Sequence, residues 1–329
     1  MIFNLLGDKI MRKVLLASTA LVALGSVSAM AADVTISGNT TWQYESYDVN
    51  GGFTGAANGT SIDHDSDVDF NFTNTTDSGL TITMAVGLNE GGSQDDQKLT
   101  IAGDFGSIRL SNDQEGVGDS AINAGGLVND ETTSLTAGLG KYGTSMSTGT
   151  MVTYNMPSMN GLSAGVSFAD AGTATRSDVT EFRVAYSTAM DGTSIDIDYV
   201  SSSTDDNGTA GATSGSDATS MGIKIGMGAM TFAANAATKS DNSATYDYQS
   251  TTVGASYNMG NGAVIGVYQN SGDNDKDADY DYEQTAASIT YTIAPGLSAA
   301  VTVTDTSMVS NAGAKSNDDY TVLELSASF

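Results

Sequence analysis

The segment Leu80–Asn89 reads LTITMAVGLN and shows most clearly the pattern from which the fold is predicted. An apolar residue occupies every second position: Leu80, Ile82, Met84, Val86 and Leu88. Successive side chains of a β-strand point to opposite faces of the sheet, so this two-residue period predicts a strand between an apolar and a polar environment.

The same period recurs along the whole chain. Candidate strands lie at 34–44, 67–73, 80–89, 96–103, 106–112, 149–156, 161–170, 178–189, 193–203, 218–227, 229–239, 247–259, 263–272, 281–293, 297–306 and 319–329. We therefore expect an all-β fold, a transmembrane antiparallel β-barrel of about 16 strands, the size that encloses a water-filled channel. The register of 263–272 stays open, because Val264 and Tyr268 share one face while Ile265 and Val267 share the other.

The connections between these strands alternate in length. Short turns fall at 76–79, 103–106, 189–192, 260–262 and 294–296, and long polar stretches at 49–66, 113–147, 202–217, 271–279 and 306–318. Outer-membrane barrels place short turns on one rim and long loops on the other, so this alternation favours the barrel over a soluble sandwich.

The longest connection, Asp113–Ser147, is far beyond ordinary loop lengths and therefore needs a function. We expect it to fold into the mouth of the barrel and narrow it. Its carboxylates would then lie at the narrowest point: Asp113, Glu115, Asp119, Asp130 and Glu131. The alternative is that these carboxylates only keep an exposed loop soluble.

The charged residues of the candidate strands alternate with apolar ones. They are the cations Lys98, Arg109, Arg183 and Lys224 and the carboxylates Asp67, Asp69, Glu181, Asp196, Asp198 and Glu324. A charge at the lipid midplane costs about 2–4 kcal/mol, so we expect these side chains to line an aqueous pore wall. A net negative lumen predicts passive diffusion of small hydrophilic solutes and ions with a mild preference for cations.

Both ends of the chain carry signals. Arg12 and Lys13 precede the apolar run 14–24 and the small-residue site at 29–31, which predicts a signal peptide over 1–31, with 1–10 as an upstream extension, before a barrel over 32–329. At the other end one face of the last strand carries Leu323, Leu325, Ala327 and Phe329, which we interpret as an assembly signal. This strand is expected to pair with the first, because an open sheet edge in hydrocarbon leaves backbone groups unsatisfied.

Aromatic residues gather near the predicted strand ends, as expected for two interfacial belts. The outer belt would contain Tyr44, Tyr47, Phe168, Tyr199, Tyr246, Tyr248, Tyr280, Tyr282 and Tyr320, and the inner belt Tyr154, Tyr186, Tyr257, Tyr291 and Phe329.

Composition excludes several functions. A net charge of −27 argues against nucleic-acid binding, and the absence of Cys excludes disulfides and thiolate metal sites. His64, placed in the first outer loop, is the sole His, so neither a two-His metal site nor an enzymatic role is expected. We expect no cofactor. An alternative is weak binding of a divalent cation such as calcium at the acidic stretches 63–67 and 273–279, the latter of which lacks the Gly and Glu of a calcium loop.

Four stretches carry a family resemblance: ADVTISG at 32–38, TTDSGL at 75–80, LTIAGDFGSIRL at 99–110 and the terminal Phe329. In these the chain resembles a general-diffusion outer-membrane porin of the alphaproteobacterial type. The resemblance implies a multi-pass homotrimer in the outer membrane of a Gram-negative bacterium, in contact with lipid and lipopolysaccharide. It also implies that the third outer loop, here Asp113–Ser147, folds inward and sets acidic residues against a basic wall. This chain departs from that pattern in having few basic residues.

Two other interpretations of the sequence remain open. A substrate-specific channel would need an aromatic or basic track in the lumen. The alternation of side chains along the strands instead points most aromatics outward. A secreted acidic β-rich adhesin or surface-layer protein would explain the composition but not the alternating loop lengths. Membrane partitioning and channel conductance separate these readings.

Overall fold

The computed structural model describes residues 33–50, 58–92, 94–112, 116–129, 150–170, 178–205, 215–241, 247–274, 280–310 and 315–329. The predicted signal peptide 1–31 lies outside these ranges. In the described ranges the chain forms β1 (Asp33–Asn50), β2 (Gly59–Thr75), β3 (Thr81–Leu88), β4 (Gln94–Gly103), β5 (Gly106–Ser111), β6 (Thr150–Asn155), β7 (Leu162–Asp170), β8 (Val179–Met190), β9 (Thr193–Thr204), β10 (Ser216–Met227), β11 (Met230–Asp241), β12 (Asp247–Asn258), β13 (Ala263–Asn274), β14 (Tyr280–Ala294), β15 (Leu297–Ser310) and β16 (Lys315–Ser328). Two short 3₁₀ helices, η1 (Gly118–Ser120) and η2 (Ala124–Leu127), lie between β5 and β6.

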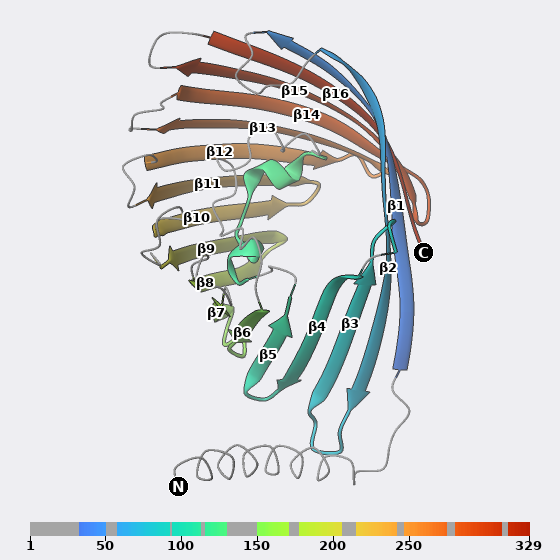
Figure 1. The fold of residues 1–329 in the computed structure, drawn as a ribbon, viewed down its shortest axis with the longest axis vertical. Helices are drawn as coiled ribbons and strands as arrows, with labels where there is room; N and C mark the ends of the chain where they lie inside the picture. Colours follow the sequence, from blue (N-terminus) through green and yellow to red (C-terminus); the bar gives the residue numbers. More distant parts are fainter. Residues whose placement is uncertain are drawn as a thin grey trace, which may run out of the picture.

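The strands form one closed antiparallel barrel in which each pairs with its neighbours in sequence and β1 pairs with β16 (Figure 1). Closure extends to the last residue, since Phe329 and Gly38 exchange backbone hydrogen bonds of 3.0 and 3.2 Å. The predicted all-β barrel of about 16 strands is confirmed. No helix among the described residues is both long and apolar enough to cross a membrane.

The two faces of the wall differ in chemistry. On β16, Leu323 and Leu325 are 45% and 46% exposed, while Val322, which precedes them and points to the opposite face, is 2% exposed. Phe329 also lies on the exposed face, so the residues of the proposed assembly signal share the outward side. Large exposed apolar side chains recur on nearly every strand, whereas the opposite face carries buried Ser, Thr, Asn, Gln and carboxylate groups. The apolar face therefore points outward and the polar face points into the barrel.

A tight turn joins β8 to β9. Asp191 and Gly192 both have positive φ, 51° and 80°, between the paired residues Met190 and Thr193. This conformation matches the right-handed twist of a two-residue hairpin, and Gly adopts it without strain.

The strands are longer at the long-loop rim than the sequence predicts. β1 continues to Asn50 and β2 starts at Gly59, so the expected loop at 49–66 is wrong in its bounds, as is the one at 306–318. Backbone pairing continues there although apolar residues no longer alternate with polar ones. The strand prediction depended on that alternation, so it ended too early. His64 consequently lies on β2 rather than in a loop, with its ring stacked on Trp42 at a centroid distance of 4.9 Å.

Strand β13 resolves its ambiguous register. Ile265 and Val267 are exposed on the outward face, and Tyr268 is buried on the inner one. Tyr282 and Tyr320 are also buried, and Tyr47 packs edge-to-face on Tyr320. The expectation that most aromatics point outward is therefore wrong for these rings near the long-loop rim.

The belt at the short-turn rim matches the expectation better. Tyr154, Tyr186, Tyr257 and Tyr291 are all exposed on the outward face. At the other rim the outward rings include Tyr44, Phe168 and Tyr199. Tyr246 and the side chain of Tyr280 lie outside the described residues.

Candidate functional site

A segment between β5 and β6, Gly116–Asn129, lies on the concave side of the sheet (Figure 1). Its helix η1 contacts β8 and β9, and η2 contacts β11, β12 and β13. Of the carboxylates expected at the narrowest point, this segment contains Asp119. The others, Asp113, Glu115, Asp130 and Glu131, lie outside the described residues.

Side chains of the wall accept hydrogen bonds from the backbone of this segment. The donors and acceptors are Val117 N–H to Ser167 Oγ (2.8 Å), Gly118 N–H to Glu181 Oε2 (3.0 Å), Ile122 N–H to Asp198 Oδ2 (2.9 Å), Ala124 N–H to Asn235 Oδ1 (2.8 Å) and Asn129 N–H to Ser288 Oγ (2.9 Å). A buried N–H without an acceptor costs about 1–3 kcal/mol, so these bonds favour the segment's position against the wall.

Asn129 extends the contact to the last two strands. Its side-chain amide donates a hydrogen bond to Glu324 Oε2 at 3.2 Å, and its backbone carbonyl accepts a hydrogen bond from the Thr302 hydroxyl. The acceptors and donors together come from β7, β8, β9, β11, β14, β15 and β16. The segment therefore follows more than half of the inner circumference.

Glu181 and Asp198 were predicted as pore-wall charges, and the structure places both on the inner wall. They are, however, 0% and 2% exposed, because the segment covers them. A buried carboxylate that accepts backbone hydrogen bonds positions the segment and is not exposed to the open lumen.

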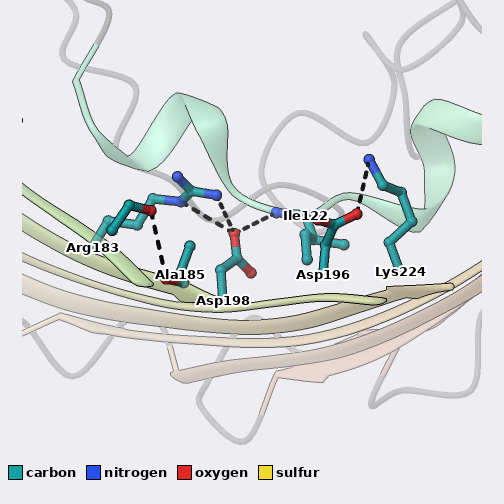
Figure 2. Close-up of polar contacts among 7 residues, drawn as sticks. Ile122, Arg183, Ala185, Asp196, Asp198 and Lys224 are labelled. Atoms are coloured by element: carbon teal, nitrogen blue, oxygen red, sulfur yellow. Dashed lines mark hydrogen bonds and ion pairs between the residues drawn. The ribbon is translucent and has the colours of Figure 1, made fainter. Parts of the chain in front are cut away.

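Asp198 also pairs with a predicted wall cation. Arg183 donates to Asp198 Oδ2 through Nη2 at 3.0 Å and through Nε at 3.2 Å. The same oxygen accepts the Ile122 N–H, so one carboxylate joins β8, β9 and the segment (Figure 2). Charge-assisted hydrogen bonds of this kind are roughly twice as strong as neutral ones.

Lys224 forms a longer pair with Asp196, at 3.9 Å, and both side chains are partly exposed (Figure 2). They line a cavity of about 460 Å³ together with Arg183 and Asp119. A second cavity, of about 240 Å³, lies between Asp119 and Arg109. Asp119 therefore lines both cavities, one with Arg183 and Lys224 and the other with Arg109. Its carboxylate accepts a hydrogen bond from the Gly116 N–H at 2.6 Å.

The remaining predicted wall charges lie on the first strands. Lys98 of β4 pairs in register with Ser111, which is buried on the inner face. On β2 the inner face carries a row of carboxylates, because Phe70 pairs with the outward Ile36 and directly opposite residues share a face. The row consists of Asp63, Asp65, Asp67 and Asp69. In the ring of strands, β2 lies directly across from β10, which carries Lys224.

Sequence reasoning missed the neutral partners of the segment: Ser167, Asn235, Ser288 and Thr302. Strand parity places them inside, but many other hydroxyl and amide side chains share that parity. No sequence signal separates those that meet the segment from those that do not.

A metal site finds no support in the described ranges, which hold no group of three or more His or carboxylate side chains arranged to hold an ion. Asp63–Asp67 belongs to a strand rather than to a loop, and 275–279 lies outside the described residues.

The fold resembles solved outer-membrane proteins. The trimer form of OmpT, an outer membrane protein of Vibrio cholerae, has a TM-score of 0.69 at 12% identity, covering 91% of this chain and 100% of its own. The anion-selective porin from Comamonas acidovorans has 0.65 at 13%, covering 91% and 100%. A variant of the Rh. blastica porin has 0.59 at 14%, covering 90% and 100%. At such identities these likenesses concern the fold alone.

Sequence comparison gives the family. No curated protein matches the chain. The Gram-negative porin family matches residues 17–311, most of the chain. The chain therefore belongs to the Gram-negative porin family and is a multi-pass β-barrel channel protein of the outer membrane.

Proposed function

We propose that this porin passes small hydrophilic solutes and ions by passive diffusion, with the segment Gly116–Asn129 narrowing the lumen. The observation that carries the proposal is the series of hydrogen bonds between this segment and the inner wall. A segment attached to β7–β9, β11 and β14–β16 reduces the open cross-section on that side of the barrel.

A mild cation preference follows from the distribution of the wall charges. Arg183 is paired with Asp198, and Lys224 with Asp196, so two of the wall cations are locally balanced. The aspartate row of β2 lies across the barrel from them. Carboxylates that line a wet pore raise the local concentration of cations without binding them tightly.

The test is the reversal potential of the purified protein in a planar bilayer under a KCl gradient. We expect cation preference in the wild type and a shift toward zero in Asp67→Asn/Asp69→Asn. The control is Asp305→Asn/Asp319→Asn, which changes two exposed outward carboxyl groups and should leave the potential unchanged. Anion preference in the wild type, or equal shifts in both variants, would refute the electrostatic part.

We also propose a homotrimer in contact with lipopolysaccharide, of the alphaproteobacterial type that its sequence stretches resemble. A solved relative with the same fold is described as a trimer form, which supports the oligomeric state. A heat-modifiable band at three times the monomer mass tests it. A monomer in native detergent extracts would contradict it.

Neither alternative gains support. The inward rings Tyr268, Tyr282 and Tyr320 are at most 5% exposed, so they pack within the wall and offer no aromatic track to a sugar. A secreted adhesin has no need of a closed barrel with an apolar exterior.

A further inference from the structure

Several wall positions beneath the segment are glycines, and each lies where a side chain would collide with it. On β10, a Cβ at Gly222 would lie 2.5 Å from Ile122 Cβ. On β12, a Cβ at Gly254 would lie 2.6 Å from the Ala124 carbonyl oxygen, and on β13 one at Gly266 would overlap the Leu127 carbonyl oxygen. Cβ atoms in folded proteins keep at least 3.0 Å from such neighbours.

All three glycines belong to the inner face. Met221 and Ile223 flank Gly222 and are exposed on the outside, as are Ile265 and Val267 around Gly266. Gly254 follows the exposed Val253. The three glycines therefore form a shallow depression in the wall between the acceptors Asp198 on β9 and Ser288 on β14, with the acceptor Asn235 on β11 between Gly222 and Gly254.

The collisions at Gly254 and Gly266 involve backbone oxygens, so no side-chain rotation relieves them. The segment is also tied on both sides of these positions, by Ala124 N–H to Asn235 and by Asn129 N–H to Ser288. With the wall behind it and its ends held, the segment has one direction left in which to move, toward the barrel axis.

We propose that Gly222, Gly254 and Gly266 determine the pore size: they set the depth at which the segment lies in the wall, and so the width of the channel beside it. This inference rests on the proposed function, because it requires that solutes pass the segment. The glycines act as positioning residues and do not themselves contact the solute.

The experiment compares Gly254→Ala and Gly266→Ala with Gly226→Ala. Gly226 shares the inner face of β10, but its added Cβ would meet only the rotatable Ser194 hydroxyl, at 2.6 Å. Single-channel conductance and the exclusion limit for neutral poly(ethylene glycol) should both fall in the first two variants and stay at the wild-type value in the control. Values equal to the control's, or above the wild type's, would overturn the proposal.

A rescue pair covers the case in which an alanine variant fails to assemble. Gly222→Ala should reduce conductance, and the double variant Gly222→Ala/Ile122→Gly should restore part of it, because the variant removes the closest contact, to Ile122, while the added Cβ stays 2.9 Å from Asp198 Oδ1. Failure of the double variant to restore conductance refutes the proposed role of these glycines. A wild-type protein without any channel refutes the proposed function as well, whereas a conducting wild type with unaffected alanine variants refutes this inference alone.

Discussion

Two arcs of the inner wall use the same residue type differently. On β8 and β9, Glu181 and Asp198 are buried beneath the segment Gly116–Asn129 and accept its backbone hydrogen bonds. On β2, Asp67 and Asp69 are partly exposed on the inner face across the barrel. An inward carboxylate is therefore an anchor or a lumen charge according to what packs over it, and strand parity alone does not distinguish the two.

Removing the anchor at Asp198 should have the largest effect. Asp198→Ala leaves the Ile122 N–H without its acceptor and Arg183 without its counter-charge. We expect a loss of about 2–3 kcal/mol in the free energy of unfolding, measured in urea with lipid vesicles, together with unstable channel conductance. Asp198→Asn, which keeps an oxygen for Ile122, should lose less. Wild-type stability and steady conductance in Asp198→Ala would contradict the anchoring role.

The two arcs should also differ in their response to salt. The Debye length falls from about 10 Å at 0.1 M to about 3 Å at 1 M ionic strength, so the cation preference should weaken over this range. The pore width, measured as the exclusion limit for neutral polymers, should not change, because the hydrogen bonds beneath the segment are buried. A cation preference independent of salt would mean that ions bind the carboxylates at close contact. That result would contradict the proposal that the carboxylates attract cations without binding them tightly.

The sequence predicts the barrel well because its period reports directly on the two environments of the wall. The alternation around Met84 or Leu323 suffices to place a strand and its faces. It fails where that contrast fades, as at His64 and Asp318, which were expected in loops but lie on β2 and β16. The alternation also cannot reveal which wall residues contact the segment, because Gly254 and Asn235 acquire their roles from a segment more than one hundred residues away in sequence.

The smallest effect on the reversal potential is expected from Glu181→Gln. This variant also tests most directly the difference between the buried and the exposed inward carboxyl groups. This change replaces a carboxyl group that is 0% exposed with an amide, yet keeps a carbonyl oxygen that can accept the Gly118 N–H. If Glu181 is an anchor, the reversal potential should match that of the wild type, while Asp69→Asn on the partly exposed face of β2 should shift it. Should Glu181→Gln shift the potential as much as Asp69→Asn, the buried arc would contribute to selectivity as strongly as the open one, and the distinction between anchor and lumen charge would fail.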